Sequence, residues 1–192
     1  MTTSRKGNKM STVKAYKGLP MEGMIASWYA KITFKDLNRH KIMANQMVGK
    51  IPANGKVLEI APSPGYFCIE LAKLGNFQIT GLDISKSFVD VARGNASDAG
   101  LKIDFREGNA SAMPFASETF DFIFCQAAFK NFSEPVKAIA EMYRVLKPGG
   151  IAVNADLRGD ASAEVIELEV NGMGLDPFNR LVVRCNGPRM GG

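Results

Sequence analysis

The sequence predicts an α/β fold, a doubly wound and mainly parallel sheet of five or more strands with helices on both faces. Short apolar runs of strand length alternate with longer segments in which apolar residues recur at helical spacing. Within this alternation, residues 56–72 have the pattern of a buried strand, a tight loop and a helix. Right-handed crossovers between such strands place ligands at the carboxyl ends of the strands.

Composition favours a single globular domain, because 46% of the 192 residues are hydrophobic and 22% are charged. The chain shows neither a membrane-length apolar run nor a hydrophobic N-terminal signal stretch, so we expect no membrane insertion and a cytoplasmic location. Cys68, Cys125 and Cys185 lack C-x-x-C spacing. They predict free thiols and no metal site.

The net charge of +5 arises in residues 1–20, which hold five basic residues and no acid. In the rest of the chain basic and acidic residues balance. We therefore expect a basic flexible tail over residues 1–20 and no nucleic-acid partner. A nucleic-acid or membrane-surface role for the tail is the less favoured alternative.

Two helices are predicted ahead of the first strand, in a segment spanning residues 21–55. Apolar residues recur at helical intervals over residues 21–34, and Asp36 can cap a second helix. His40 shares a face with apolar residues of that second helix, which favours a partly buried side chain over a catalytic base.

From residue 56 onward strands and helices alternate regularly, which assigns residues 56–158 to the sheet-forming core. Strands are predicted at 57–60, 77–82, around Ile103 and Phe105, at 120–125 and at 151–157. Ser85 caps the helix after the second strand. In the helix over residues 135–146, the expected inward residues are Val136, Ile139, Ala140, Tyr143 and Leu146. Residues 147–150, Lys-Pro-Gly-Gly, are expected to stop that helix and form a turn.

The loop after the first strand is rich in turn residues, with prolines at 62 and 64. A dinucleotide fingerprint there would need glycines at positions 61, 63 and 66, but Ala61, Ser63 and Tyr66 occupy them. Asp83 ends the second strand, where an open α/β sheet places the acid that accepts hydrogen bonds from both ribose hydroxyls of a nucleotide. Its alternative role is to cap the following helix.

Residues 59–65, Glu-Ile-Ala-Pro-Ser-Pro-Gly, resemble the first motif of class I S-adenosylmethionine-dependent methyltransferases, E/D-x-G-x-G-x-G. Glu59 matches the acid and Gly65 the last glycine, whereas Ala61 and Ser63 replace the other two glycines. Ala61 costs little if its φ is negative, and Ser63 is the more serious change.

The resemblance continues in residues 105–115, where Asn109 stands for the usual Asp of this family. It implies that Asn109 accepts from the exocyclic amine of adenine, that Ala110 offers its backbone amide, and that Met113 and Ile84 flank the ring. For Met113 a place in the core is equally expected. Cys125 and Gln126, at the end of the fourth strand, would lie under the methionine portion of the cofactor.

Residues 141–150, EMYRVLKPGG, are typical of the small-molecule branch of this family, and the Asn/Asp-Pro-Pro-aromatic motif of nucleic-acid methyltransferases is absent. The chain thus resembles members of this branch, which implies a Rossmann-like fold. The resemblance implies S-adenosylmethionine as cofactor, S-adenosylhomocysteine as product and a small-molecule acceptor. It also implies that the helical segment at residues 21–55 forms a lid over the cofactor, although core packing of Trp28 and Tyr29 is an equal alternative. The implied cofactor site comprises Glu59, Ala61, Ser63, Gly65, Tyr66, Asp83, Ile84, Asn109, Ala110, Met113, Cys125 and Gln126.

In-line methyl transfer needs orientation more than a covalent nucleophile, and no catalytic residue is identified. His40, Tyr29 and Lys130 are possible bases by type alone. Two alternatives remain open, a cofactor-binding but catalytically silent domain that acts through a partner and, third, an NAD-dependent oxidoreductase.

A complete sheet of this family has seven strands, the last two antiparallel. Residues 159–192 predict only a short helix over 161–170, one short strand at 181–183 and a tail. The final pair is therefore expected to be incomplete, which leaves the fifth strand as an edge. Either residues 181–183 dock there or the protein forms a homo-oligomer.

Overall fold

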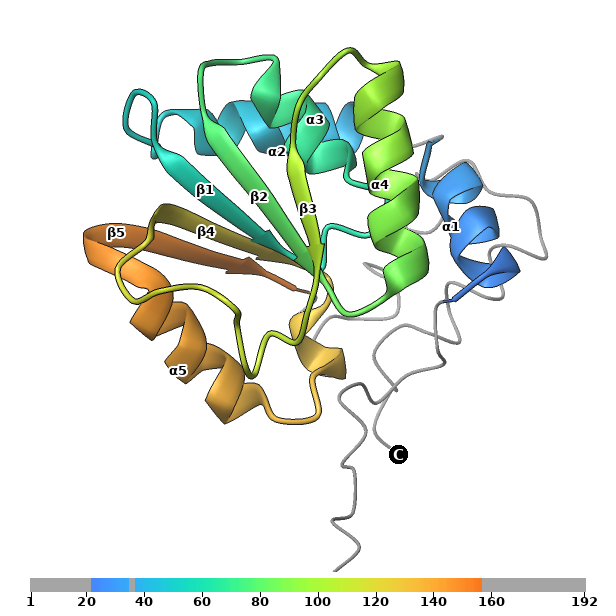
Figure 1. Ribbon diagram of the computed structural model, residues 1–192. Coiled ribbons are helices and arrows are strands. Elements are labelled where there is room, and N and C mark those ends of the chain that lie inside the picture. The colour runs from blue at the N-terminus through green and yellow to red at the C-terminus, as the bar shows by residue number, and fades with distance from the viewer. Residues whose placement is uncertain (1–21, 35–36, 157–192) are drawn as a thin grey trace, which may run out of the picture.

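The computed structural model describes residues 22–34 and 37–156 (Figure 1). Several predictions concern other parts of the chain and lie outside the described residues. These are the basic tail, the cap at Asp36, Cys185, the helix over 161–170 and the strand at 181–183.

Five parallel strands form one sheet, in the order β3-β2-β1-β4-β5. They are β1 (Lys56–Ile60), β2 (Gln78–Asp83), β3 (Asp104–Glu107), β4 (Phe120–Gln126) and β5 (Leu146–Ala155). The central strand β1 places Glu59 opposite Gly81 of β2 and Phe124 of β4. The order reverses between β1 and β4, as in a doubly wound sheet, and the predicted fold class is confirmed.

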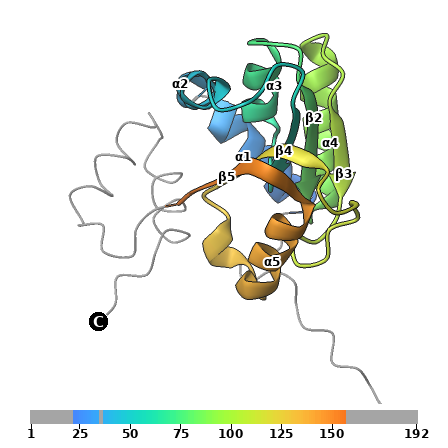
Figure 2. The same cartoon turned by 90° about the vertical axis from the view of Figure 1, so that its left-hand side faces the viewer.

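Helices cover both faces of this sheet (Figures 1 and 2). On one face lie α2 (Leu37–Val48), α3 (Tyr66–Ala72) and α4 (Lys86–Asp98), and α1 (Met24–Phe34) lies against α4. The opposite face carries α5 (Pro135–Val145), which follows the short 3₁₀ helix η1 (Phe129–Asn131).

The sheet separates two hydrophobic clusters, because successive side chains of a strand point to opposite faces. Val57 packs with α2, α3 and α4, whereas Leu58 and Ile60 pack with α5. On the first face Phe67 of α3 stacks on Phe124 of β4 with ring centroids 4.2 Å apart. Because both faces are covered, β1 is an almost continuous apolar run, as the sequence predicted.

The expected inward face of α5 is wrong. Val136, Ile139 and Tyr143 are 79%, 54% and 83% exposed, and Ala140 is also exposed. The residues that face the sheet are Ala138, Met142 and Val145. Leu146, the fifth expected residue, is half-buried and begins β5. The helix carries two apolar stripes of the same period, and periodicity alone cannot rank them.

The expected turn at residues 147–150 is instead the first part of β5, which begins at Leu146. Pairing with β4 shifts there, since Phe120 is opposite Leu146 and Phe122 is opposite Ile151. At the shift, the Asp121 carboxylate accepts hydrogen bonds from Lys147 Nζ at 2.8 Å and from the backbone N–H of Lys56 at 2.8 Å. These contacts keep the irregular segment in the sheet. Among the described strands, β5 forms one edge of the sheet.

The two stripes of α5 give a direct test of its orientation. Val145→Ala removes two buried methyl groups and is expected to lower the free energy of unfolding by about 2 kcal/mol. Val136→Ala, on the exposed stripe, is expected to stay within about 0.5 kcal/mol of the parent. Urea unfolding of both variants is the measurement. Equal losses would contradict the observed orientation.

Candidate functional site

The loop between β1 and α3 adopts left-handed backbone conformations at the positions where the family motif has glycine. The φ angles are 55° at Ala61, 50° at Ser63 and 79° at Gly65. The condition under which Ala61 would cost little, a negative φ, is therefore not met. A left-handed conformation costs a residue with a Cβ about 1 to 2 kcal/mol. The loop keeps the conformation of a glycine loop at this cost.

Gly65 is required for packing as well as for its φ. A Cβ there would lie 2.8 Å from Cζ of Phe105 and 3.0 Å from the Cβ of Ala92. A Cβ on Gly81 of β2 would meet the same ring, 2.5 Å from Cδ1 of Phe105. The Phe105 side chain from the edge strand β3 thus packs over a bare backbone on both β2 and the loop.

Asp83 joins this loop to the end of β2. Its side chain is buried, Oδ2 accepts from the Ser63 N–H at 3.0 Å, and Oδ1 accepts from the Ser85 N–H at 2.9 Å. It is not the cap of α4, because Ser85 is the N-cap and its Oγ accepts from the Phe88 N–H at 3.1 Å. Burial raises the pKa of Asp83 to about 6. A carboxylate has about four acceptor sites, so Asp83 retains capacity for ligand hydroxyls.

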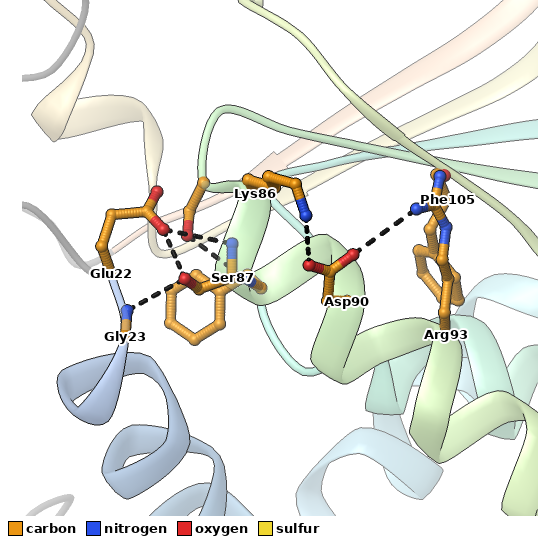
Figure 3. Close-up of polar contacts among 9 residues, drawn as sticks. Glu22, Gly23, Lys86, Ser87, Asp90, Arg93 and Phe105 are labelled. Carbon is orange, nitrogen blue, oxygen red and sulfur yellow. Dashed lines mark hydrogen bonds and ion pairs between the residues drawn. The ribbon is translucent and has the colours of Figure 1, made fainter.

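Glu22 joins the start of α1 to the amino end of α4 through Ser87 (Figure 3). Its Oε2 accepts from the Ser87 hydroxyl and from the Ser87 N–H at 3.1 Å, and the Gly23 N–H donates to Ser87 Oγ at 2.9 Å. The bond from the Ser87 side chain lowers the pKa of Glu22, and the charge of Glu22 contributes to the raised pKa of Asp83.

Sequence reasoning missed Glu22. It is the first acid of the chain and lies within the predicted helical segment 21–34, but its partner Ser87 is 65 residues away. Nothing in the local pattern indicates such a contact.

The segment that follows β3 is held by hydrogen bonds at two places, at Asp83 and at the amino end of α5. The Gly108 N–H donates to the Asp83 backbone carbonyl at 2.8 Å, and the Ser111 hydroxyl donates to the Glu134 carbonyl at 3.1 Å. Between these points the Asn109 Oδ1 accepts from the Ser111 N–H at 2.9 Å. The side-chain oxygen predicted to meet adenine is thus oriented by its own turn, and it keeps a second acceptor site.

The predicted ring-flanking residues differ in their surroundings. Ile84 is 41% exposed at the end of β2, whereas the Met113 side chain is buried in the cluster beneath α5. At the end of β4, Cys125 is fully buried in that same cluster, and burial raises its pKa to about 12. Gln126 is half-buried. Cys125 can therefore offer a ligand its backbone rather than its thiol.

Glu59, the acid of the first motif, lies inside the protein. It is 4% exposed, and the Cys68 thiol donates to its Oε2 at 2.8 Å. Burial raises the pKa of Glu59 to about 7 and that of Cys68 well above its usual value. Tyr66 is also buried, and its hydroxyl donates to the Ala30 carbonyl at 3.1 Å, which joins α3 to α1.

The three possible bases lie in different places. His40 packs among the helices with its ring centroid 5.8 Å from that of Tyr66. Its Nδ1 is buried and has no hydrogen-bond partner, and it is the one such side-chain nitrogen or oxygen within residues 22–34 and 37–156. Burial lowers its pKa to about 4, so it is neutral at pH 7. Tyr29 packs edge-on against Phe88. Lys130 is exposed in η1, directly after the carboxyl end of β4.

The structure therefore brings Ala61, Ser63, Gly65, Asp83 and Asn109 to one end of the sheet. Tyr66 and the side chains of Glu59, Met113 and Cys125 lie in the packed interior.

Within the described part of the chain, no helix has the length and apolar character needed to cross a membrane. Nor do those residues include three or more His, Cys, Asp or Glu side chains placed to hold a metal ion.

Residues 58–154 match the model of a protein family described as a methyltransferase domain. The chain belongs to this family. The assignment confirms the predicted class I methyltransferase resemblance, and the cofactor of that class is S-adenosylmethionine.

Curated relatives of the family align with the central part of the chain. A demethylmenaquinone methyltransferase of Deinococcus radiodurans is 37% identical over 108 residues, which cover 56% of this chain and 45% of that protein. A ubiquinone/menaquinone biosynthesis C-methyltransferase of a Marinomonas species is 36% identical over 104 residues, covering 52% of this chain and 41% of the relative. The match thus spans less than half the length of these relatives.

Solved structures share the fold. A candidate S-adenosylmethionine-dependent methyltransferase from Methanococcus maripaludis aligns with a TM-score of 0.69 at 24% identity, over 95% of this chain and 86% of that one. The [4+2]-cyclase SpnF aligns with a TM-score of 0.59 at 24% identity, over 70% of this chain and 56% of that one. Because one fold carries different chemistries, function has to be argued from the site.

The strained loop makes a specific prediction about stability. Ala61→Gly and Ser63→Gly relieve a left-handed conformation, so each is expected to leave the free energy of unfolding unchanged or to raise it by up to about 1 kcal/mol. Ala140→Gly, at an exposed helical position of α5, is the matched control and is expected to cost about 1 kcal/mol. Chemical unfolding compares them. A loss at Ala61 as large as that at Ala140 would show that the loop stores no strain.

Proposed function

We propose that this chain binds S-adenosylmethionine at the carboxyl ends of β1 to β4 and transfers its methyl group to a small molecule. The observation that carries the proposal is the buried carboxylate of Asp83, held by the Ser63 and Ser85 amides at the end of β2. A buried acceptor with unused capacity beside a glycine-like loop suits a ligand that presents ribose hydroxyls.

The residues at this end of the sheet fit the parts of the cofactor. Asp83 would accept from the ribose, the loop at 61–65 would face the methionine portion, and Asn109 with Ala110 would contact adenine. Ile84, which is exposed, would contact the ring more readily than Met113, which is buried. When bound, the sulfonium supplies an activated methyl group, so the protein's task is to orient the acceptor and exclude water.

The acceptor is proposed to be a small molecule because the relatives are named for quinone substrates. A demethylated quinol is therefore the first acceptor to test. Of the possible bases, Lys130 lies nearest in sequence to a strand end of the site. His40 would contribute to packing rather than to proton transfer, because it is neutral and sits among helices.

Titration calorimetry with S-adenosylhomocysteine and, separately, with NAD tests the proposal. We expect binding of S-adenosylhomocysteine and none of NAD. Transfer of a labelled methyl group to a demethylated quinol then tests turnover. Binding without transfer to any small acceptor would favour a catalytically silent domain, and binding of NAD alone would favour an oxidoreductase.

Asp83→Ala is expected to weaken S-adenosylhomocysteine binding by about 1.5 to 3 kcal/mol, because a charged acceptor is lost. Asp90→Ala is the matched control, since Asp90 lies on the exposed side of α4 paired with Lys86 and should leave affinity unchanged (Figure 3). Calorimetry gives the affinities, and thermal unfolding checks that both variants fold. Unchanged affinity in a folded Asp83→Ala protein would remove Asp83 from the site.

The raised pKa of Asp83 predicts a pH dependence of binding. The ionised carboxylate accepts from the ribose, so affinity is expected to fall as pH drops through about 6. The stability of the free protein should change in the opposite direction. Its free energy of unfolding should fall as pH rises towards about 6, because folding raises the pKa of Asp83. Calorimetry from pH 5 to about 8 measures the binding profile. Asp83→Asn should remove the pH dependence of binding. If only Glu59→Gln removes it, the titrating group is Glu59.

A further inference from the structure

Glu141 and Arg144 form a two-point ion pair on α5. Arg144 Nε donates to Glu141 Oε1 at 2.7 Å, and Nη2 donates to Oε2 at 2.8 Å. Their side chains are 20% and 34% exposed. A pair of this spacing on an open helix surface contributes little to stability. Here, however, both side chains also contact another segment of the chain.

That segment is the one after β3. Glu141 Oε2 accepts from the Met113 N–H at 2.7 Å, while Arg144 donates from Nη2 to the Met113 carbonyl at 3.1 Å and from Nη1 to the Phe115 carbonyl at 2.7 Å. The backbone N–H and carbonyl of Met113 are therefore both held by this ion pair, although Glu141 and Arg144 are 28 and 31 residues away in sequence. The N–H donors of a guanidinium group have a fixed planar geometry, so they define the positions of the carbonyls that they bind.

The segment is fixed at its other end by Asp83, whose carbonyl accepts from the Gly108 N–H at 2.8 Å. Asn109 and Ala110 lie between these two anchors. The turn around them is closed by the Ala112 N–H, which donates to the Asn109 carbonyl at 3.0 Å. The stretch proposed to meet adenine is thus suspended between the proposed ribose acid and the α5 ion pair.

We infer that Glu141 and Arg144 are positioning residues that hold residues 108–115 so that Asn109 and Ala110 distinguish adenine from other bases. This inference rests on the proposed function. A polar edge is read selectively only if its donor and acceptor are in place before the ligand arrives, since ordering them on binding costs affinity. The pair provides that order without touching the ligand.

The test uses two ligands that differ only at the base. S-Adenosylhomocysteine carries an exocyclic amine, and S-inosylhomocysteine carries an oxygen at the same position. Glu141→Gln and Arg144→Gln each break the ion pair while keeping a polar side chain of similar size. Lys137→Ala is the matched control, because Lys137 of the same helix forms an i,i+3 pair with Glu134, the N-cap residue of α5.

For the parent protein, calorimetry is expected to show preference for the adenine ligand. In each α5 variant, affinity for S-adenosylhomocysteine should fall by about tenfold, equivalent to about 1.4 kcal/mol, and the preference over the inosine ligand should shrink towards one. Lys137→Ala should keep both values. The double variant should lose no more than either single one, because the two side chains act as one unit.

Thermal unfolding separates positioning from stability. Variants that fold, bind both ligands more weakly by the same factor and keep the preference would show a purely structural pair and overturn the inference. If the parent binds S-adenosylhomocysteine and the variants retain full preference, the positioning role fails while the proposed function stands. If the parent binds neither ligand, the proposed function and the inference fail together.

Discussion

The buried carboxylate of Asp83 is the contact on which the proposed ligand end of the sheet depends. One oxygen fixes the Ser63 amide of the first loop, the other fixes the Ser85 amide ahead of α4, and the backbone carbonyl holds Gly108. Three segments that leave different strands are thereby tied to the end of β2. A charge in this position is desolvated, and the raised pKa of Asp83 records that cost. The protein gains a fixed acceptor in return.

The first loop shows how a glycine conformation persists without glycine. Hydrogen bonds from the Ala61 and Ser63 amides, to Leu82 and to Asp83, hold the backbone in the left-handed region despite the added Cβ atoms. Strain of this size is tolerated where surrounding contacts over-determine the backbone, which is common at ligand sites. The Ser63 hydroxyl adds a polar group that the family motif lacks.

Much of this architecture could be predicted from the sequence because local patterns determine it. The apolar run of β1, the acid that ends β2 and the Ser85 cap each follow a local rule that tertiary contacts did not override. The inward face of α5 could not be predicted, because two apolar stripes have the same period and only packing against the sheet selects one. The contact of Glu22 with Ser87 likewise needs the folded chain. The interior positions of Glu59 and Cys125 follow from strand register, which residue type alone does not reveal.

The ring of Phe105 has a consequence for how this site can change during evolution. It lies so close to Gly65 and Gly81 that either glycine can gain a side chain only if the ring shrinks or moves. Conversely, a smaller residue at position 105 would leave a void beside Gly81 of β2 and Gly65 of the loop. The edge strand β3, the strand β2 and the loop between β1 and α3 are therefore expected to vary together in related sequences, with substitutions at these three positions appearing as a correlated set rather than one at a time.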